Sequence, residues 1–198
     1  MWEYLSTHAL EILGVVLGII YLVFEMKAWW PLWIISIIMP INSLFVYYQA
    51  GLYADFAIDI YYVLAAVYGL IVWLRGKKGV SGKKKEELPI VRTPLKAVPV
   101  YTLIFAVLLV GIAYVLINWT NSTVPWADSF TTALSVIALW MLAHKQIEQW
   151  WVWFVVDLVS AALYFYKGIP FYGGLYFLYT VLAVVGYFQW KKKLAKKS

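Results

Sequence analysis

A series of apolar segments, each about as long as a bilayer-spanning helix, constrains the fold of this chain more than any other feature. A transmembrane helix needs about 20 predominantly apolar residues. The segments that qualify are 7–26, 31–50, 54–74, 97–118, 127–144, 150–166 and 171–190. Only 13% of the 198 residues are charged and 64% are hydrophobic, whereas about 25% of a soluble domain is charged. The sequence therefore predicts an all-α integral membrane protein with seven transmembrane helices.

The basic residues lie almost entirely on one side of these predicted helices. If the N-terminus is outside, all sixteen Lys and Arg residues except Lys167 fall in cytoplasmic connections or in the tail after Trp190. Because cytoplasmic loops carry an excess of Lys and Arg, we expect the N-terminus outside and the C-terminus inside. Membrane topology thus accounts for the net charge of +6, and we expect a lipid bilayer rather than nucleic acid as the partner.

The residues that usually hold metals or form disulfides are scarce. The chain has no cysteine and two histidines, His8 and His144, which lie far apart in the sequence. This composition excludes a disulfide framework and a thiol nucleophile, and it argues against a metal site. We therefore expect neither a cofactor nor a catalytic centre of those kinds.

One long hydrophilic stretch, from Arg75 to Lys96, divides the chain, and its lysines, glycines and prolines favour a mobile linker. We expect a first three-helix unit and then a basic cytoplasmic linker. A fourth helix with an external loop would follow, and then a second three-helix unit with a basic tail. The corresponding ranges are 1–75, 76–96, 97–126 and 127–198.

An internal repeat links the two three-helix units. At an offset of 117 residues, Ser43, Tyr47, Gly51, Tyr62, Ala66, Val67, Gly69 and Trp73 recur as Ser160, Tyr164, Gly168, Tyr179, Ala183, Val184, Gly186 and Trp190. Upstream, with a shift of three residues, Trp30 and Trp33 match Trp150 and Trp153. Because one helix separates the units, both enter the membrane in the same direction. Parallel repeats of this kind hold a transported substrate at their interface.

Two aspartates, Asp59 and Asp157, fall well inside predicted membrane helices. An aspartate at the centre of a transmembrane helix costs about 2.5–3.5 kcal/mol and usually faces a cavity that carries a substrate, ion or proton. The alternative is a packing role in which neighbouring Ser and Tyr hydroxyls satisfy the carboxylates.

Helical spacing surrounds these aspartates with aromatic residues. One face of 150–166 carries Trp150, Trp153, Asp157, Ser160 and Tyr164, and one face of 54–74 carries Asp55, Asp59, Tyr62, Ala66, Gly69 and Trp73. A face of 171–190 carries Tyr172, Tyr176, Tyr179, Ala183, Gly186 and Trp190, and a stripe of 7–26 carries Glu11, Gly14, Gly18, Tyr21 and Glu25. Aromatic rings beside carboxylates suit a flat, positively charged heteroaromatic ligand.

Together these residues form a signature that resembles the PnuC family of bacterial inner-membrane vitamin transporters. The signature comprises Leu52-Tyr53-Ala54-Asp55, Tyr68-Gly69, Trp73, Thr131-Thr132, Ser135, Lys145, Glu148 and Trp150-x-x-Trp153-x-x-x-Asp157. The resemblance implies a seven-helix, three-one-three fold related to the SWEET sugar transporters. It also implies facilitated diffusion of a vitamin, a cytoplasmic kinase that traps the product, and no cofactor. Whether copies of the chain form a homo-oligomer is left open.

The resemblance also bears on which vitamin is carried. In nicotinamide riboside carriers the last residue of the Trp-x-x-Trp-x-x-x-Asn element is an amide, whereas this chain has Asp157. A glutamine of those carriers falls at Asp59. Carboxylates in place of amides favour thiamine, with nicotinamide riboside, which is also a cation, as the alternative. Phosphorylated forms are disfavoured by like charge.

The expected substrate-binding residues are Trp150, Trp153, Asp157, Asp59, Tyr62, Ser160, Tyr164, Tyr176, Tyr179 and Ser135. A retinal protein is excluded because 171–190 contains no lysine for a Schiff base. An intramembrane enzyme with Asp59 and Asp157 as an acid–base pair and a proton-coupled carrier remain as alternatives.

Overall fold

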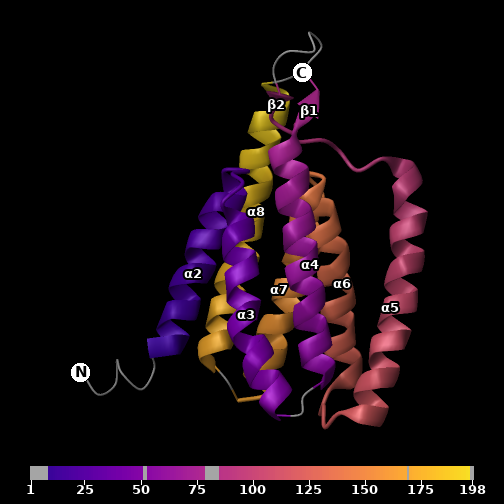
Figure 1. The fold of residues 1–198 in the computed structure, drawn as a ribbon. Helices are drawn as coiled ribbons and strands as arrows, with labels where there is room; N and C mark the ends of the chain where they lie inside the picture. The colour runs from indigo at the N-terminus through magenta and orange to yellow at the C-terminus, as the bar shows by residue number, and fades with distance from the viewer. Residues whose placement is uncertain (1–8, 51–52, 79–84, 169, 197–198) are drawn as a thin grey trace.

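The computed structural model describes residues 9–50, 53–78, 85–168 and 170–196, which are almost entirely helical (Figure 1). The long helices are α2 (Ala9–Met26), α3 (Leu32–Ala50), α4 (Tyr53–Arg75), α5 (Val98–Trp119), α6 (Pro125–Ala143), α7 (Gln149–Tyr166) and α8 (Pro170–Ala195). Prolines in the first turn of α5 and at the start of α6 lie where a missing N–H leaves no hydrogen bond unmade. The seven predicted helices are therefore confirmed as helices.

Three stretches of the described residues are long and apolar enough to cross a membrane: Phe56–Arg75, Leu95–Trp119 and Pro125–Ala143. Two shorter apolar stretches are Val16–Met26 and Leu32–Ile41. The helices α7 and α8 are less apolar because tryptophan, tyrosine and Asp157 interrupt their aliphatic residues, and because α8 continues into the lysine-rich tail. Length and hydropathy thus support three of the seven predicted spans.

The helices form two sets of three with one helix beside them (Figure 1). In the first set α3 packs on α2 and α4, and in the second α7 packs on α6 and α8. The helix α5 packs against α6. Helices α2, α4, α6 and α8 run toward the end at which the C-terminus lies, whereas α3, α5 and α7 run the opposite way. Corresponding helices of the two sets therefore point in the same direction.

The two sets match in position along the chain. Adding 117 to the first residues of α2, α3 and α4 gives 126, 149 and 170, and α6, α7 and α8 begin at Pro125, Gln149 and Pro170. Gly51 of the sequence repeat lies outside the described residues, as do the side chains of Ser43 and Tyr47. The helical layout thus follows the same offset as the sequence repeat.

The turns after α2 and α6 also correspond. Ala28 and Lys145, again 117 residues apart, both have positive φ, 54° and 50°. The next amide in each turn donates to the carbonyl five residues earlier, from Trp29 to Phe24 at 2.9 Å and from Gln146 to Met141 at 2.9 Å. This bond is characteristic of the Schellman motif, which ends a helix on a left-handed residue.

A tryptophan packs on a glycine at the same place in each set, and this contact corrects the predicted register. A Cβ on Gly69 would come within 2.5 Å of the Trp33 ring, and a Cβ on Gly186 would come equally close to the Trp150 ring. Trp33 therefore corresponds to Trp150, and the predicted three-residue shift is wrong. Pairs of tryptophans three residues apart invited alignment by residue type, whereas the glycine contact determines the true register.

The same contact continues to a second tryptophan in each set. The Trp33 and Trp73 rings meet edge to face at 5.5 Å, and the Trp150 and Trp190 rings do so at 5.7 Å. These four rings belong to the buried core of the bundle.

The two sets are joined at the end of the bundle that carries the lysine-rich tail, here called the basic end. Helix α2 packs on α8 there, and α4 packs on α6. The indole N–H of Trp190 donates to the carbonyl of Glu25 at 2.9 Å, and that of Trp73 donates to the carbonyl of Ala143 at 3.1 Å. Lys145 Nζ donates to the carbonyl of Ala28 at 3.2 Å and lies 4.1 Å from the centre of the Trp73 ring.

The described part of the linker is anchored to the turn between α6 and α7, contrary to the expectation of a mobile segment. The strands β1 (Lys77–Lys78) and β2 (Lys85–Glu86) pair antiparallel. Further along, the Val91 amide donates to Lys145, and Val91 accepts from Ile147, both at 2.9 Å. Thr93 donates through its amide and hydroxyl to Glu148 at 2.7 and 2.8 Å. Composition indicates solvent exposure here but does not reveal these backbone pairings.

Candidate functional site

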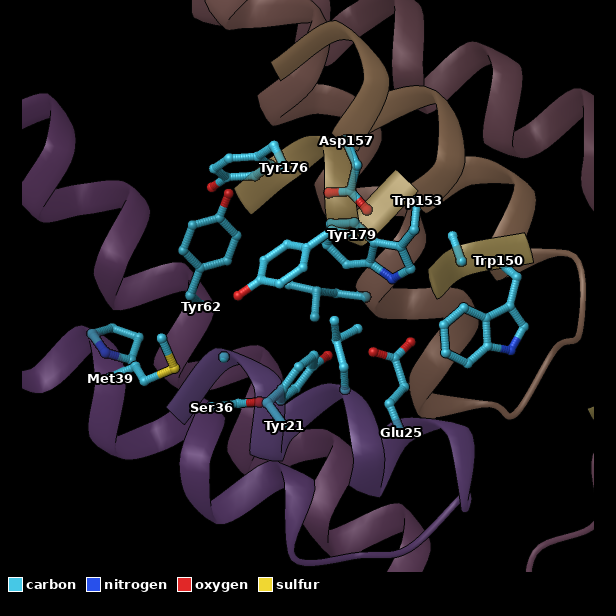
Figure 2. A pocket seen from close by; sticks show the side chains of 15 residues that line it. Tyr21, Glu25, Ser36, Met39, Tyr62, Trp150, Trp153, Asp157, Tyr176 and Tyr179 are labelled. Atoms are coloured by element: carbon cyan, nitrogen blue, oxygen red, sulfur yellow. The ribbon is translucent and has the colours of Figure 1, made fainter. Parts of the chain in front are cut away.

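A cavity of about 290 Å³, here called the central cavity, lies between the two sets of helices (Figure 2). Its walls are Gly18, Tyr21, Leu22 and Glu25 of α2, Ser36, Met39 and Pro40 of α3, Tyr62 of α4, Leu139 of α6, Trp150, Trp153 and Asp157 of α7, and Tyr176, Tyr179 and Ala183 of α8. The walls include four pairs of residues 117 apart: Leu22 with Leu139, Ser36 with Trp153, Pro40 with Asp157, and Tyr62 with Tyr179. The cavity therefore lies at the interface between the two sets.

Helix α7 supplies the carboxylate and indole rings predicted from its sequence. Trp153 and Asp157 are four residues apart and both face the central cavity, as helical spacing requires for neighbours on one face. Trp150 borders the cavity, but only 1% of it is exposed because its ring packs on Gly186 and Trp190. Trp153 is thus the α7 tryptophan whose ring is available to a ligand.

Tyrosines form a second side of the central cavity. Figure 2 shows Tyr62, Tyr176 and Tyr179 side by side, opposite Tyr21. The Tyr176 ring stacks on Tyr164 with 5.1 Å between centroids. Such ring faces offer π surface for an aromatic or cationic ligand.

A larger cavity of about 690 Å³, here called the outer cavity, extends from the central cavity away from the basic end. Tyr62, Trp153 and Tyr176 line both cavities, so the two are contiguous. The predicted residues Ser135, Ser160 and Tyr164 line the outer cavity and not the central one.

The rim of the outer cavity carries one ion pair between α6 and the turn after α7. Lys167 Nζ lies 2.9 Å from Asp128 Oδ1, and both residues line the outer cavity. Lys167, the basic residue predicted to lie apart from all the others, is thus neutralised by an acidic neighbour.

Asp59 lines neither cavity, although the sequence predicted it as a binding residue. Its Oδ2 atom is buried, and Tyr62, one turn further along α4, extends into the cavity instead. The periodicity of α4 placed Asp59 and Tyr62 on one face but did not show which of the two borders the cavity.

Glu25 supplies the second carboxylate of the central cavity, and it was missing from the predicted binding residues. It is 1% exposed and lies beside the Tyr21 hydroxyl and the Gln149 amide. Helical spacing could have identified Glu25, because Tyr21 and Glu25 both belong to the predicted stripe of 7–26. The side chains of Glu11 on that stripe and of Asp55 on α4 lie outside the described residues. No sequence pattern identified Ser36, Met39 and Pro40 as residues of the cavity.

The central cavity has unmet hydrogen-bonding capacity and a negative charge. Glu25 Oε1 and Trp153 Nε1 are buried and have no hydrogen-bond partner. Asp157 and Glu25 line the cavity, while no Lys, Arg or His is among the described residues that do so. Buried polar atoms without partners are costly, so a ligand that supplies both a donor and an acceptor would satisfy them.

No group of three His, Cys, Asp or Glu side chains that could hold a metal ion occurs among the described residues. The cavity thus offers stacking surfaces, hydrogen bonds and negative charge.

A third cavity, of about 270 Å³, lies at the basic end and shares no lining residue with the central cavity. Lysines line it, among them Lys27, Lys145 and Lys193. Burial lowers the pKa of Lys193, and nearby Glu87 partly offsets this effect. Lys193 Nζ donates to the Lys27 carbonyl at 2.6 Å. This cavity is therefore distinct from the central one and is lined by basic rather than acidic and aromatic side chains.

Comparison with known proteins shows relatives that span most of the chain. The riboflavin/roseoflavin transporter RibM of Streptomyces davaonensis is 28% identical over 187 residues, which cover 91% of this chain and 83% of RibM. The nicotinamide riboside transporter PnuC of Neisseria mucosa is 26% identical over 194 residues, covering 92% of this chain and 72% of that protein. Escherichia coli PnuC is 22% identical over 169 residues, covering 73% and 69%.

A solved structure has the same fold. The crystal structure of the vitamin B3 transporter PnuC superimposes with a TM-score of 0.75 at 21% identity, covering 100% of this chain and 86% of that one. The family described as nicotinamide mononucleotide transporter matches residues 8–192. This chain is therefore a multi-pass membrane protein of the nicotinamide mononucleotide transporter (PnuC) family of vitamin transporters, and not an enzyme.

Proposed function

We propose that this protein carries an unphosphorylated, cationic heteroaromatic vitamin across the membrane, and that this vitamin is nicotinamide riboside. The observation that carries the proposal is the central cavity, where Asp157 and Trp153 share one face of α7 and no basic side chain is present among the described lining residues. A pyridinium ring would stack on Trp153 and be attracted by the carboxylate. The ribose hydroxyls would supply donors for the carboxylates and acceptors for the indole N–H.

Thiamine, which Asp59 and Asp157 favoured in the sequence, becomes the less favoured substrate. The relatives described above are named for nicotinamide riboside or riboflavin. Moreover, the second aspartate on which the preference for thiamine depended, Asp59, lines neither cavity. Thiamine is still a cation of suitable shape, so it belongs in any binding test.

Riboflavin is a second candidate because RibM is 28% identical over 91% of this chain. The charge of the central cavity argues against it. The flavin ring is neutral, and it would bury Asp157 and Glu25 without a cationic partner, which costs free energy. Phosphorylated vitamins are disfavoured more strongly, because the phosphate would lie against the same carboxylates.

Transport by this fold would use the two sets of helices as parallel repeats that rock about the central cavity. We assign residues 1–75 and 127–198 to the repeats, 76–96 to a cytoplasmic linker, and 97–126 to the linker helix with its external loop. All seven long helices would cross the membrane, with the basic end in the cytoplasm as the positive-inside rule favours. The central cavity borders the outer cavity and shares no lining residue with the cavity at the basic end, so we propose that this conformation faces the outside.

The proposed energetics are facilitated diffusion, with a cytoplasmic kinase that traps the vitamin as its phosphate. The kinase need not touch the carrier, because phosphorylation alone prevents return through a cavity that disfavours negative charge. A proton-coupled carrier is the competing reading, since carboxylates can carry protons.

Calorimetry of the purified protein tests the substrate. We expect nicotinamide riboside to bind most tightly, thiamine less tightly, and riboflavin and nicotinamide mononucleotide at least about tenfold more weakly, a difference of about 1.4 kcal/mol. Tightest binding of riboflavin would assign the protein to the flavin carriers, and tightest binding of thiamine would restore the first preference. Either result contradicts the proposal.

A further inference from the structure

Glu25 is a buried carboxylate without a cationic partner among the described residues. It lies in the last turn of α2, is 1% exposed, and its Oε1 atom has no hydrogen-bond partner. No ion pair of Glu25 occurs within the part of the chain that the structure describes. Burying such a charge without a cationic partner costs free energy, which the neighbouring Gln149 amide and Tyr21 hydroxyl offset only in part.

The corresponding position in the second set of helices shows what the fold requires there. Adding 117 to Glu25 gives Leu142, which is 0% exposed and packs in the core. Each residue lies three positions before the left-handed residue that ends its helix, Ala28 or Lys145. A leucine thus satisfies the packing and the turn at this site, so the carboxylate is an addition to the fold.

Glu25 and Asp157 approach the central cavity from different sides. In Figure 2 the Glu25 carboxylate points into the cavity from α2, and Asp157 borders it from α7 beyond Tyr179. Asp157 also lacks a counterpart, because adding 117 to Pro40 gives 157 and Pro40 carries no charge. Each carboxylate of the cavity therefore lies where the corresponding position in the other set of helices is uncharged.

We infer that Glu25 is a specificity-determining residue that makes the cavity select a positively charged ring over a neutral ring of similar size. The inference rests on the proposed binding of a cationic vitamin in the central cavity. A cation held between Asp157 and Glu25 interacts with both carboxylates in a cavity where charge pairing is stronger than in water. A neutral ring leaves both carboxylates unpaired.

The test compares two ligands that differ mainly in charge. Nicotinamide riboside carries a pyridinium cation, and its reduced dihydropyridine form is uncharged and of similar size. In the wild-type protein we expect the cation to bind at least about tenfold more tightly. Glu25→Gln keeps the shape of the side chain, and we expect it to lower this ratio by about tenfold or more. If thiamine proves the tighter ligand, thiamine and its uncharged 3-deaza analogue form the equivalent pair.

Glu87→Gln is the matched control, because it removes the same type of charge at an exposed position outside the central cavity. We expect it to leave the ratio unchanged. An unchanged ratio in Glu25→Gln would overturn the inference while leaving the proposed function intact. If the wild type bound neither member of either pair, the proposed function would fail, and this inference would fail with it.

A second variant separates charge selection from a structural role. Glu25→Leu installs the residue that the corresponding position already uses. Because it removes an unpaired buried charge, we expect the ligand-free protein to melt at a higher temperature, while the preference for the cation falls as in Glu25→Gln. A lower melting temperature together with an unchanged preference would show that the carboxylate serves the fold, and would overturn the inference.

Discussion

The two tryptophans of α7 occupy one helical face but have different neighbours. Trp150 fills the space that Gly186 leaves open and meets the edge of Trp190. Trp153 lines the central and outer cavities, and its Nε1 atom has no hydrogen-bond partner. The first ring therefore stabilises the second set of helices, and the second ring is the one we expect to bind the vitamin.

This difference predicts opposite effects for two similar substitutions. Trp153→Ala should weaken nicotinamide riboside binding by about 1–3 kcal/mol, roughly tenfold to a hundredfold, because it removes a stacking surface. Its melting temperature should stay close to that of the wild type. Trp150→Ala should instead lower the stability by about 3–5 kcal/mol, because it leaves a cavity in the core. Calorimetry measures the affinity of both variants, and thermal melting measures their stability. A Trp150→Ala protein as stable as the wild type would contradict the structural role of Trp150.

Asp157 should control which cation is preferred. Asp157→Asn removes the charge, keeps the shape, and restores the residue that the family resemblance implies for nicotinamide riboside carriers. We expect thiamine, which has fewer hydroxyls to compensate, to lose more than about tenfold in affinity. Nicotinamide riboside should lose less, because the amide can bond its ribose. Equal losses for both ligands in competition binding would count against a role for Asp157 in discrimination.

The sequence predicted the α7 side of the site but not the α2 side. Trp153 and Asp157 could be found because helical periodicity places both on one face. Asp59 and Glu25 were harder to distinguish, since both are acidic residues on polar stripes of membrane helices. Their roles depend on what each side chain meets on the neighbouring helices, and periodicity within one helix carries no information on those neighbours.

At the scale of the helices, the basic end is held closed by contacts between the two sets. The Trp190 indole of α8 donates to the carbonyl of Glu25 on α2, and the Trp73 indole of α4 donates to Ala143 on α6. The donors of these two bonds correspond at the offset of 117 residues, and each bond joins one set to the other. If the protein alternates access, they must break when the central cavity opens toward the basic end.

Weakening one of these bonds should therefore favour opening at the basic end. Trp190→Phe keeps an aromatic ring, although a smaller one, and removes the N–H, whose hydrogen bond contributes about 0.5–1.5 kcal/mol. Because the chain contains no cysteine, Ser36→Cys in the central cavity gives a single labelling site. We expect a membrane-impermeant thiol reagent applied to the basic end to label it about fivefold faster in Trp190→Phe.

The control for this experiment is Trp119→Phe on α5, where the tryptophan is 72% exposed. It should label at the rate of the Ser36→Cys parent. Equal labelling rates for Trp190→Phe and Trp119→Phe would show that the basic end is not the closed gate.

The helices and the repeat offset could be predicted because apolar segments and recurring glycines are local signals. The alignment of the two sets around their tryptophan pairs could not be predicted. Both pairs, Trp30 with Trp33 and Trp150 with Trp153, have the same residue type at the same spacing. Only the contact of Trp33 with Gly69 and of Trp150 with Gly186 resolves it. The anchoring of Val91 beside Ile147 likewise depends on backbone hydrogen bonds, which a loop composition does not reveal.

At the scale of the whole molecule, the structure combines an anionic cavity, a contiguous outer cavity and a closed basic end. This arrangement suits a carrier whose cavity faces one side at a time, with the vitamin between corresponding helices. In the proposed account, charge in the cavity would select the vitamin and disfavour its phosphate, so a cytoplasmic kinase would make uptake one-way without a coupling ion.

Uptake of labelled nicotinamide riboside into proteoliposomes tests this account most directly. With no imposed gradient, the label should reach the same concentration inside as outside, and liposomes without the protein should stay empty over the same time. Imposed pH or sodium gradients should leave this final level unchanged. Accumulation above the outside concentration under either gradient, or no uptake at all, would contradict the account.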